Sequence, residues 1–340
     1  MSTTTQAASA VTFGQTLGRR LLAGVRRVEL ALLPAIALAV VVGTIVNDRF
    51  LTTENLTNVL QQSSVLAIVV VAEAIVLIVG RFDLSLESIV GLAPMLGGWL
   101  ITSHTVGGSG WEWSPALGIV ACLVAGALVG AFNGLLVVKL RLNAFIVTLA
   151  VLILLRGITL GMTSGETLYD LPSAFLYIGA ASWLGIPVSV WLAAFLFLVA
   201  DLLLRRHRAG RAVYAVGGNA EAARAAGIRV DRVVLACFVL AGTLAALAGL
   251  VYSGFIASVP ANQGQNLIFT VFAASVIGGI SLNGGRGSML GALSGVLLLG
   301  IIQNILTLSQ IASFWINASF GAIILIALVL ARLTTGEAQE

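Results

Sequence analysis

The sequence predicts an all-α polytopic membrane protein with about ten transmembrane helices, and three observations support this fold class. Apolar residues make up 59% of the 340 residues, and charged residues only 9%. A soluble chain of this length could not bury so much apolar surface. A helical span needs about 20 mostly apolar residues. About ten such runs fit in the chain, and basic residues gather at their ends.

The apolar runs are expected to cross the membrane in order. The run at 30–46 follows four arginines but exceeds a usual signal-peptide core, so we expect an uncleaved first span. The other spans are expected at about 59–80, 87–103, 115–138, 143–162, 186–204, 233–255, 267–282, 288–309 and 314–332, with some short or broken. This divides the chain into an N-terminal tail (1–28), a transmembrane domain (29–333) and a C-terminal tail (334–340).

The basic residues predict the orientation of the chain. Of the eighteen Lys and Arg residues, sixteen fall on one side of the expected spans, Arg49 falls on the other, and Arg156 lies within a span. Cytoplasmic loops carry an excess of Lys and Arg. We therefore expect both termini and the loop 205–232, which holds seven basic residues, in the cytoplasm. The net charge of +4 is then no indication of nucleic-acid binding.

A short helix is predicted inside the 205–232 loop. Asn219 can cap its N-terminus, and Glu221 lies in the first turn, where the helix dipole favours an anion. Gly227 suits the left-handed position after its C-terminus. About two turns are too short to be stable alone in water. We expect the helix to rest either on the membrane surface or on a partner protein.

Several polar residues fall where lipid would disfavour them. Glu73 lies near the middle of the second span, and Asp83 and Ser85 follow it in a break that also contains Arg81 and Glu87. A second break, 277–288, holds five glycines in twelve residues. Two interrupted segments in the two halves of a chain point towards a midplane site in many transporters. Arg81 and Asp83 could instead form a local ion pair.

Uncharged polar side chains lie in or beside other spans. They include Asn133, Thr148, Gln303 and Asn304. Each could form hydrogen bonds between helices, and together they supply the donors and acceptors that a polyol needs.

Enzyme and metal-site signals are weak. The chain has no Gly-x-x-x-x-Gly-Lys-Ser/Thr loop, and Lys139 is its only lysine, so no conventional P-loop ATPase site is expected. His104 and His207 are expected on opposite sides of the membrane and form no metal cluster. Cys122 and Cys237 lie in apolar runs and are expected to be small buried hydrophobes. No nucleophile–base pair stands out, so we expect neither catalytic residues nor a cofactor in this chain.

Five sequence segments, in this order and spacing, resemble permease subunits of ribose-type sugar ABC importers. They are Asp83-Leu84-Ser85, the stretches 133–137 and 145–149, the loop segment 210–228 and the glycine-rich stretch 277–288, with Arg156-Gly157 and Gly165 as further matches. The resemblance covers about residues 58–333. The chain departs from the family pattern at Gly80-Arg81-Phe82, at Leu86-Glu87-Ser88, at Asn143-Ala144 and at Glu73.

The resemblance implies a homodimeric permease of the bacterial inner membrane that moves a monosaccharide or similar small polyol. It implies a periplasmic or lipid-anchored solute-binding protein and a separate cytoplasmic ATPase that binds ATP and Mg. The 205–232 loop would dock on this ATPase, and the coupling residues would be Arg211, Gly217, Gly218, Asn219, Glu221, Ala222, Ala223 and Gly227. The substrate pathway would involve Glu73, Asp83, Ser85, Asn133, Thr148, Gln303 and Asn304.

Other functions remain open at this point. A gradient-driven secondary carrier could use Glu73 or Asp83 as a proton or cation site. An ABC permease for a nucleoside, a branched-chain amino acid or another small polar solute is a closer competitor. An integral-membrane enzyme is disfavoured because no catalytic cluster is present.

Overall fold

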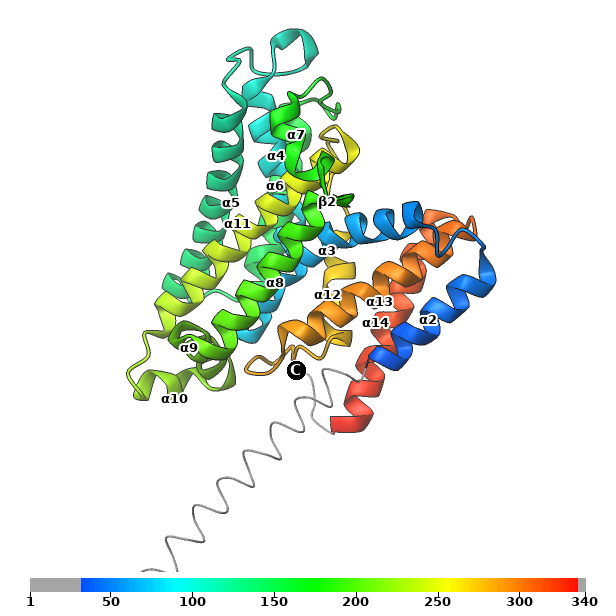
Figure 1. Ribbon diagram of the computed structural model, residues 1–340. Coiled ribbons are helices and arrows are strands. Elements are labelled where there is room, and N and C mark those ends of the chain that lie inside the picture. The colour runs from blue at the N-terminus through cyan, green and yellow to red at the C-terminus, as the bar shows by residue number, and fades with distance from the viewer. Residues whose placement is uncertain (1–31, 336–340) are drawn as a thin grey trace, which may run out of the picture.

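The computed structural model describes residues 32–335, and nearly all of its regular structure is helical (Figure 1). Each of the ten predicted spans is a helix. They are α2 (Leu33–Val46), α3 (Thr53–Ile78), α4 (Leu86–Ile101), α5 (Pro115–Lys139), α6 (Ala144–Met162), α8 (Val188–Arg206), α11 (Val230–Ile256), α12 (Leu267–Ile277), α13 (Met289–Leu308) and α14 (Ser313–Thr335). The all-α membrane fold is confirmed. The predicted tails lie outside the described residues, apart from residues 334 and 335.

The helices differ in length, as the broken sequence pattern predicts. Six helices in the described range are long and apolar enough to cross a membrane, whereas α2, α4 and α12 are shorter apolar helices. With 11 residues, α12 is about 16 Å long. The hydrocarbon core of a bilayer is about 30 Å thick. Therefore α12 alone crosses only about half of it.

Several smaller elements are not predicted by the sequence analysis. They are η1 (His104–Val106), α7 (Ser173–Ala180), β1 (Ser182–Trp183), β2 (Ile186–Pro187) and α9 (Arg208–Gly218), while α10 (Ala220–Ala225) is the predicted capped helix. The two short strands pair in an antiparallel hairpin. The stretch before Asn219, which the sequence analysis treats only as part of the 205–232 loop, is an 11-residue helix.

The core of the molecule lies around α3. Residues 63–79 of α3 and its end are all buried, and α3 packs against α8, α11, α12 and α13. On one side of this centre, α5 and α11 cross closely because both carry glycine at the contact. A Cβ atom added to Gly126 would lie 2.4 Å from the carbonyl oxygen of Gly242. Small residues allow this backbone approach between membrane helices.

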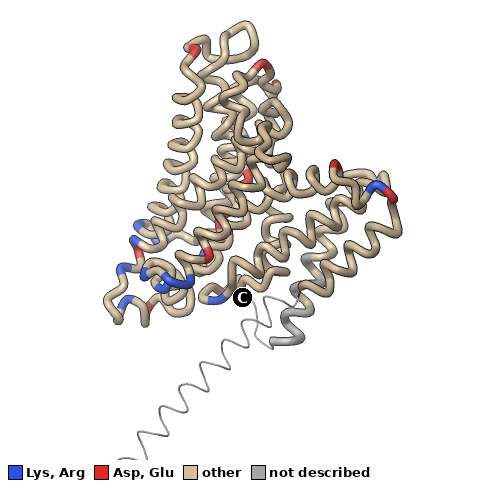
Figure 2. The backbone as a smooth tube through the Cα atoms, in the orientation of Figure 1, with Lys and Arg blue, Asp and Glu red and all other residues tan. Residues whose placement is uncertain are grey.

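Basic residues gather at one end of the molecule. Figure 2 shows most of the Lys and Arg residues around α9, α10 and the adjacent helix ends. The described part of the chain therefore has the asymmetry on which the predicted orientation depends. The position of this end relative to the cytoplasm stays a prediction.

Candidate translocation and coupling sites

The connection between α3 and α4 holds a closed polar cluster. Asp83, Ser85 and Asn133 are fully buried. Asp83 Oδ1 accepts hydrogen bonds from the Ser85 backbone N–H (3.0 Å) and the Ser85 hydroxyl (2.6 Å). The Asn133 amide nitrogen donates to Ser85 Oγ at 2.7 Å and lies 3.5 Å from Asp83 Oδ1. A side chain of α5 thereby fixes the turn that leads from α3 into α4.

Two other predicted pathway residues border this cluster. The Thr148 hydroxyl of α6 accepts from the Leu84 backbone N–H at 3.1 Å and donates to the carbonyl of Ala144 at 2.9 Å. Glu73 is fully buried, and within the described residues neither of its carboxylate oxygens has a hydrogen-bond partner. Five of the seven predicted pathway residues thus gather in the protein interior.

Arg81 does not form the ion pair with Asp83 that the sequence left open. Its Nη1 donates to the carbonyl of Gly80 at 3.0 Å, and Asp83 is engaged by Ser85 and Asn133.

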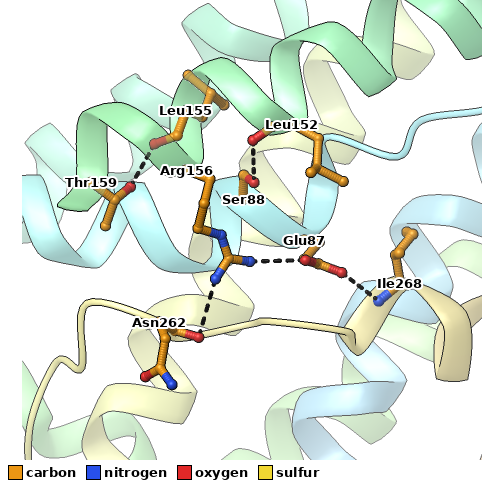
Figure 3. Close-up of polar contacts among 8 residues, drawn as sticks. All are labelled: Glu87, Ser88, Leu152, Leu155, Arg156, Thr159, Asn262 and Ile268. Atoms are coloured by element: carbon orange, nitrogen blue, oxygen red, sulfur yellow. Dashed lines mark hydrogen bonds and ion pairs between the residues drawn. The ribbon is translucent and has the colours of Figure 1, made fainter. Parts of the chain in front are cut away.

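Glu87, in the first turn of α4, is the centre of a separate cross-link between four segments (Figure 3). Arg156 of α6 contacts Glu87 Oε1 through Nη2 at 2.8 Å, and its Nη1 donates to the carbonyl of Asn262 at 3.3 Å. The backbone N–H of Ile268, in the first turn of α12, donates to Glu87 Oε2 at 3.3 Å. Glu87 therefore holds the N-terminus of the half-length helix α12 against α4 and α6.

A cavity of about 630 Å³ lies between α3, α11, α12, α13, α14 and the loop that precedes α12. Neutral amides and aromatic rings supply much of its lining, and the lining contains no Asp, Glu, Lys or Arg residue. The amides belong to Gln62, Asn262, Gln263, Gln265, Asn266, Gln303 and Asn317, and the rings to Tyr252, Phe255 and Phe320. This set of donors, acceptors and apolar faces suits an uncharged polar molecule.

Only one of the seven predicted pathway residues lines this cavity. Gln303 does so, whereas the neighbouring Asn304 exchanges two hydrogen bonds with Asn55, at 2.8 and 3.0 Å. The sequence analysis misses the amides at 262–266. This segment has no apolar periodicity that would predict a helix or strand. Its four closely spaced amides are the sequence feature that could have indicated a polar site.

The predicted coupling helix is present as α10. Asn219 Oδ1 accepts from the Ala222 backbone N–H at 2.9 Å, which confirms the N-cap. Gly227 has φ +84°, which confirms the left-handed position. Ala223 is buried, whereas the Glu221 side chain is 87% exposed and lies 3.2 Å from Arg224. One face of α10 therefore packs on the protein and the other is available to a partner.

Five glycines join this segment to both breaks in the membrane domain. We call Gly80, Gly217, Gly218, Gly284 and Gly285 the glycine junction. The backbone N–H of Gly285 donates to the carbonyl of Ile78 at 2.8 Å. A Cβ atom added to Gly217 would lie 1.8 Å from that same carbonyl oxygen. The end of α9, the end of α3 and the glycine-rich loop thus meet backbone against backbone.

Two further predicted coupling residues lie in α9 and α10. Arg211 donates to the carbonyl of Arg206 at 3.3 Å, and Ala222 carries the N–H that Asn219 caps. Tyr214, which the sequence analysis did not select as a coupling residue, donates its hydroxyl to the carbonyl of Gly287 at 2.8 Å. This bond is a second link between α9 and the glycine-rich loop.

Comparison with known proteins identifies the family of the chain. Residues 55–333 match the family model described as the permease component of branched-chain amino acid transport systems. The chain belongs to this permease family. It is 33% identical over 317 residues to the ribose import permease protein of Escherichia coli (strain K12), covering 92% of this chain and 96% of the relative.

Two other relatives extend the comparison. Identity is 35% over 295 residues with the ribose import permease protein of Bacillus subtilis (strain 168), covering 86% of this chain and 89% of the relative. It is 33% over 301 residues with the autoinducer 2 import system permease protein of Escherichia coli (strain K12 / DH10B), covering 88% and 86%. The chain is therefore a ribose-type ABC importer permease and a multi-pass protein of the inner membrane.

Two observations concern metal-binding and thiol groups in the described residues. They contain no group of three or more His, Cys, Asp and Glu side chains that could hold a metal ion. Cys122 and Cys237 are both buried and free, as predicted.

Proposed function

We propose that this permease imports a monosaccharide or similar small polyol and that the 630 Å³ cavity is part of its pathway. The amide-rich, uncharged lining supports this proposal. Amides and hydroxyls can exchange hydrogen bonds with sugar hydroxyls, and aromatic rings can pack against a sugar ring. The relatives named for ribose import support the same substrate class.

An amino acid is the second candidate, because the family model is named for branched-chain amino acid transport. Its carboxylate and ammonium groups would find no charged side chain in the cavity lining. The amides could form hydrogen bonds with these groups, but no side chain of the lining would balance their charges. The lining therefore favours the uncharged polyol.

We further propose that α9 and α10 dock on a separate cytoplasmic ATPase, which binds ATP and Mg, and that this chain has no cofactor or enzymatic activity of its own. The exposed Glu221 side chain and the basic end of the molecule support a docking role. Movement of α10 would reach α3 and the glycine-rich loop through the glycine junction. The predicted coupling residues 211–227 all lie in or beside these two helices.

The remaining parts of the proposal concern assembly. Two copies of the chain would form a homodimer, with both termini in the cytoplasm. A periplasmic or lipid-anchored solute-binding protein would deliver the substrate to the face opposite α9 and α10. Of the pathway residues predicted from sequence, Gln303 would contact substrate, and the buried Asp83 cluster would hold the α3–α4 turn.

The test combines uptake and co-purification in the native host. Wild type should support ATP-dependent uptake of labelled ribose but not of labelled leucine, and an ATPase should co-purify in mild detergent. Glu221→Arg should reduce both uptake and the co-purified ATPase at least tenfold. Gln303→Ala should reduce uptake several-fold and leave the ATPase bound.

The matched control for docking is Glu166→Arg, which reverses an exposed carboxylate far from α10 in the sequence. It should leave the amount of co-purified ATPase unchanged. Uptake of leucine in preference to ribose would overturn the substrate class. Retention of the ATPase by Glu221→Arg would overturn the docking surface.

A further inference from the structure

A second cavity, of about 390 Å³, is an apolar groove between α8 and α11. Both helices pack along α3, whose buried Val71 and Ile75 form the floor of the groove. Leu203 of α8 and Leu240 of α11 lie on its walls and are each nearly half exposed. Since α8 and α11 are spans, the groove opens within the membrane and its occupant must be apolar over most of its length.

One end of the groove is positively charged. Arg229 and Arg232, at the start of α11, line it there, and no Asp or Glu residue belongs to the lining. Both arginines are exposed, and the structure shows no ion pair of either guanidinium with a described residue. Asp231 lies between them in sequence, but its carboxylate is 3.5 Å from Arg224. The two guanidinium groups can therefore receive an anion.

We propose that this groove binds one anionic phospholipid from the leaflet on the α9–α10 side. An acyl chain occupies the apolar groove, and the headgroup phosphate lies at Arg229 and Arg232. Arginine suits phosphate because its planar guanidinium can donate two parallel hydrogen bonds. Basic pockets between membrane helices are recognised sites for anionic headgroups. A zwitterionic lipid could fill the groove but would gain less from the two cations.

The occupied groove affects the coupling segment, because its lining includes Ala209, Gly210 and Val213 of α9. Gly210 sits so close to α8 that an added Cβ would lie 2.3 Å from the carbonyl oxygen of Leu203. An acyl chain between α8 and α11 would therefore pack directly against the first residues of α9. The lipid stabilises the position of the helix that carries Gly217 of the glycine junction.

The experiment is native mass spectrometry of the detergent-purified complex, with palmitoyl-oleoyl phosphatidylglycerol or phosphatidylcholine added at equal concentrations. Wild type should retain phosphatidylglycerol in preference to phosphatidylcholine. The double variant Arg229→Gln/Arg232→Gln should weaken phosphatidylglycerol retention about 25-fold, at about fivefold per arginine. Glycerol 3-phosphate without acyl chains should not compete, because it cannot fill the groove.

Two matched controls separate this site from general effects. Lys139→Gln/Arg141→Gln removes two cations outside the groove lining, at the junction of α5 and α6, and should retain the lipid. Ala236→Trp fills the groove wall with both arginines intact and should lose the lipid, whereas Ala194→Trp, at an exposed position outside the lining, should not.

Equal retention of the two lipids by wild type would overturn the proposal. So would unchanged phosphatidylglycerol retention by Ala236→Trp, or displacement of the lipid by glycerol 3-phosphate. If the complex keeps its ATPase and its uptake while one of these results is obtained, the lipid site fails and the proposed transport function stands.

Discussion

Glu87 and Glu73 are both buried carboxylates of this membrane protein, yet their surroundings are opposite. Glu87 contacts Arg156 with one oxygen and the backbone N–H of Ile268 with the other. Within the described residues, neither oxygen of Glu73 has a hydrogen-bond partner. The Glu87 side chain joins three helices, whereas Glu73 forms no hydrogen bond with a described residue that would join it to another helix. A buried carboxylate is therefore informative through its partners, and its depth alone does not show what it does.

The largest effect should come from removing the cation beside Glu87. Arg156→Met leaves a buried carboxylate without its partner, and breaking a buried pair costs about 3 kcal/mol. The thermal unfolding midpoint of the purified protein in detergent measures this loss. The double variant Glu87→Gln/Arg156→Met should recover more than half of it, because no lone charge remains. A single variant as stable as wild type would contradict the structural role of the pair.

A smaller effect should come from the Asp83 cluster, which resembles Glu87 in having partners but contains no cation. Asn133→Leu removes the amide that donates to Ser85. It should lower the free energy of unfolding by about 2 kcal/mol, because the buried Ser85 hydroxyl loses a hydrogen-bond partner. The same unfolding assay checks the value. Asn304→Leu is the comparison, since the Asn304–Asn55 pair is only partly buried and should cost less. If both variants lost the same free energy of unfolding, burial of the Asp83 cluster would contribute nothing extra to stability.

The smallest effect should come from Glu73→Gln. The substitution keeps the shape of the side chain and breaks no hydrogen bond with a described residue, so the free energy of unfolding should fall by less than about 0.5 kcal/mol. ATP-driven uptake should persist in this variant, and collapse of the proton gradient should not abolish it. Uptake that is lost both in Glu73→Gln and on collapse of the proton gradient would favour the gradient-driven carrier, for which Glu73 is the proton or cation site.

Much of the fold follows from the sequence because apolar length is a strong signal. All ten spans are predicted, and α10 is predicted from local chemistry, since the residues that cap it are its neighbours. Helix α9 is not predicted, because three glycines in 11 residues lower its helix propensity. Its stability comes from contacts that the sequence does not show, such as Gly210 on α8 and Gly217 on the end of α3.

The candidate sites show the same division. Asp83 and Ser85 are two residues apart, and their contact can be anticipated. Their partner Asn133 is 48 residues from Ser85, and Arg156 is 69 residues from Glu87. Such pairs depend on which helices the fold places together. The amide-lined cavity depends on five helices and a loop at once, so that only Gln303 among its lining residues is predicted to contact substrate.

The enclosure of α3 has a consequence for how the protein is made. In its most apolar 18-residue window, 89% of the positions are buried in the finished protein. Yet α11, α12 and α13, which cover much of it, begin more than 150 residues after α3 ends. At about 5–20 residues per second, the ribosome needs roughly 10–40 s to reach them. During that interval α3, with the carboxyl group of Glu73, must lie in lipid or beside the insertion machinery. Only later do α11, α12 and α13 pack around it.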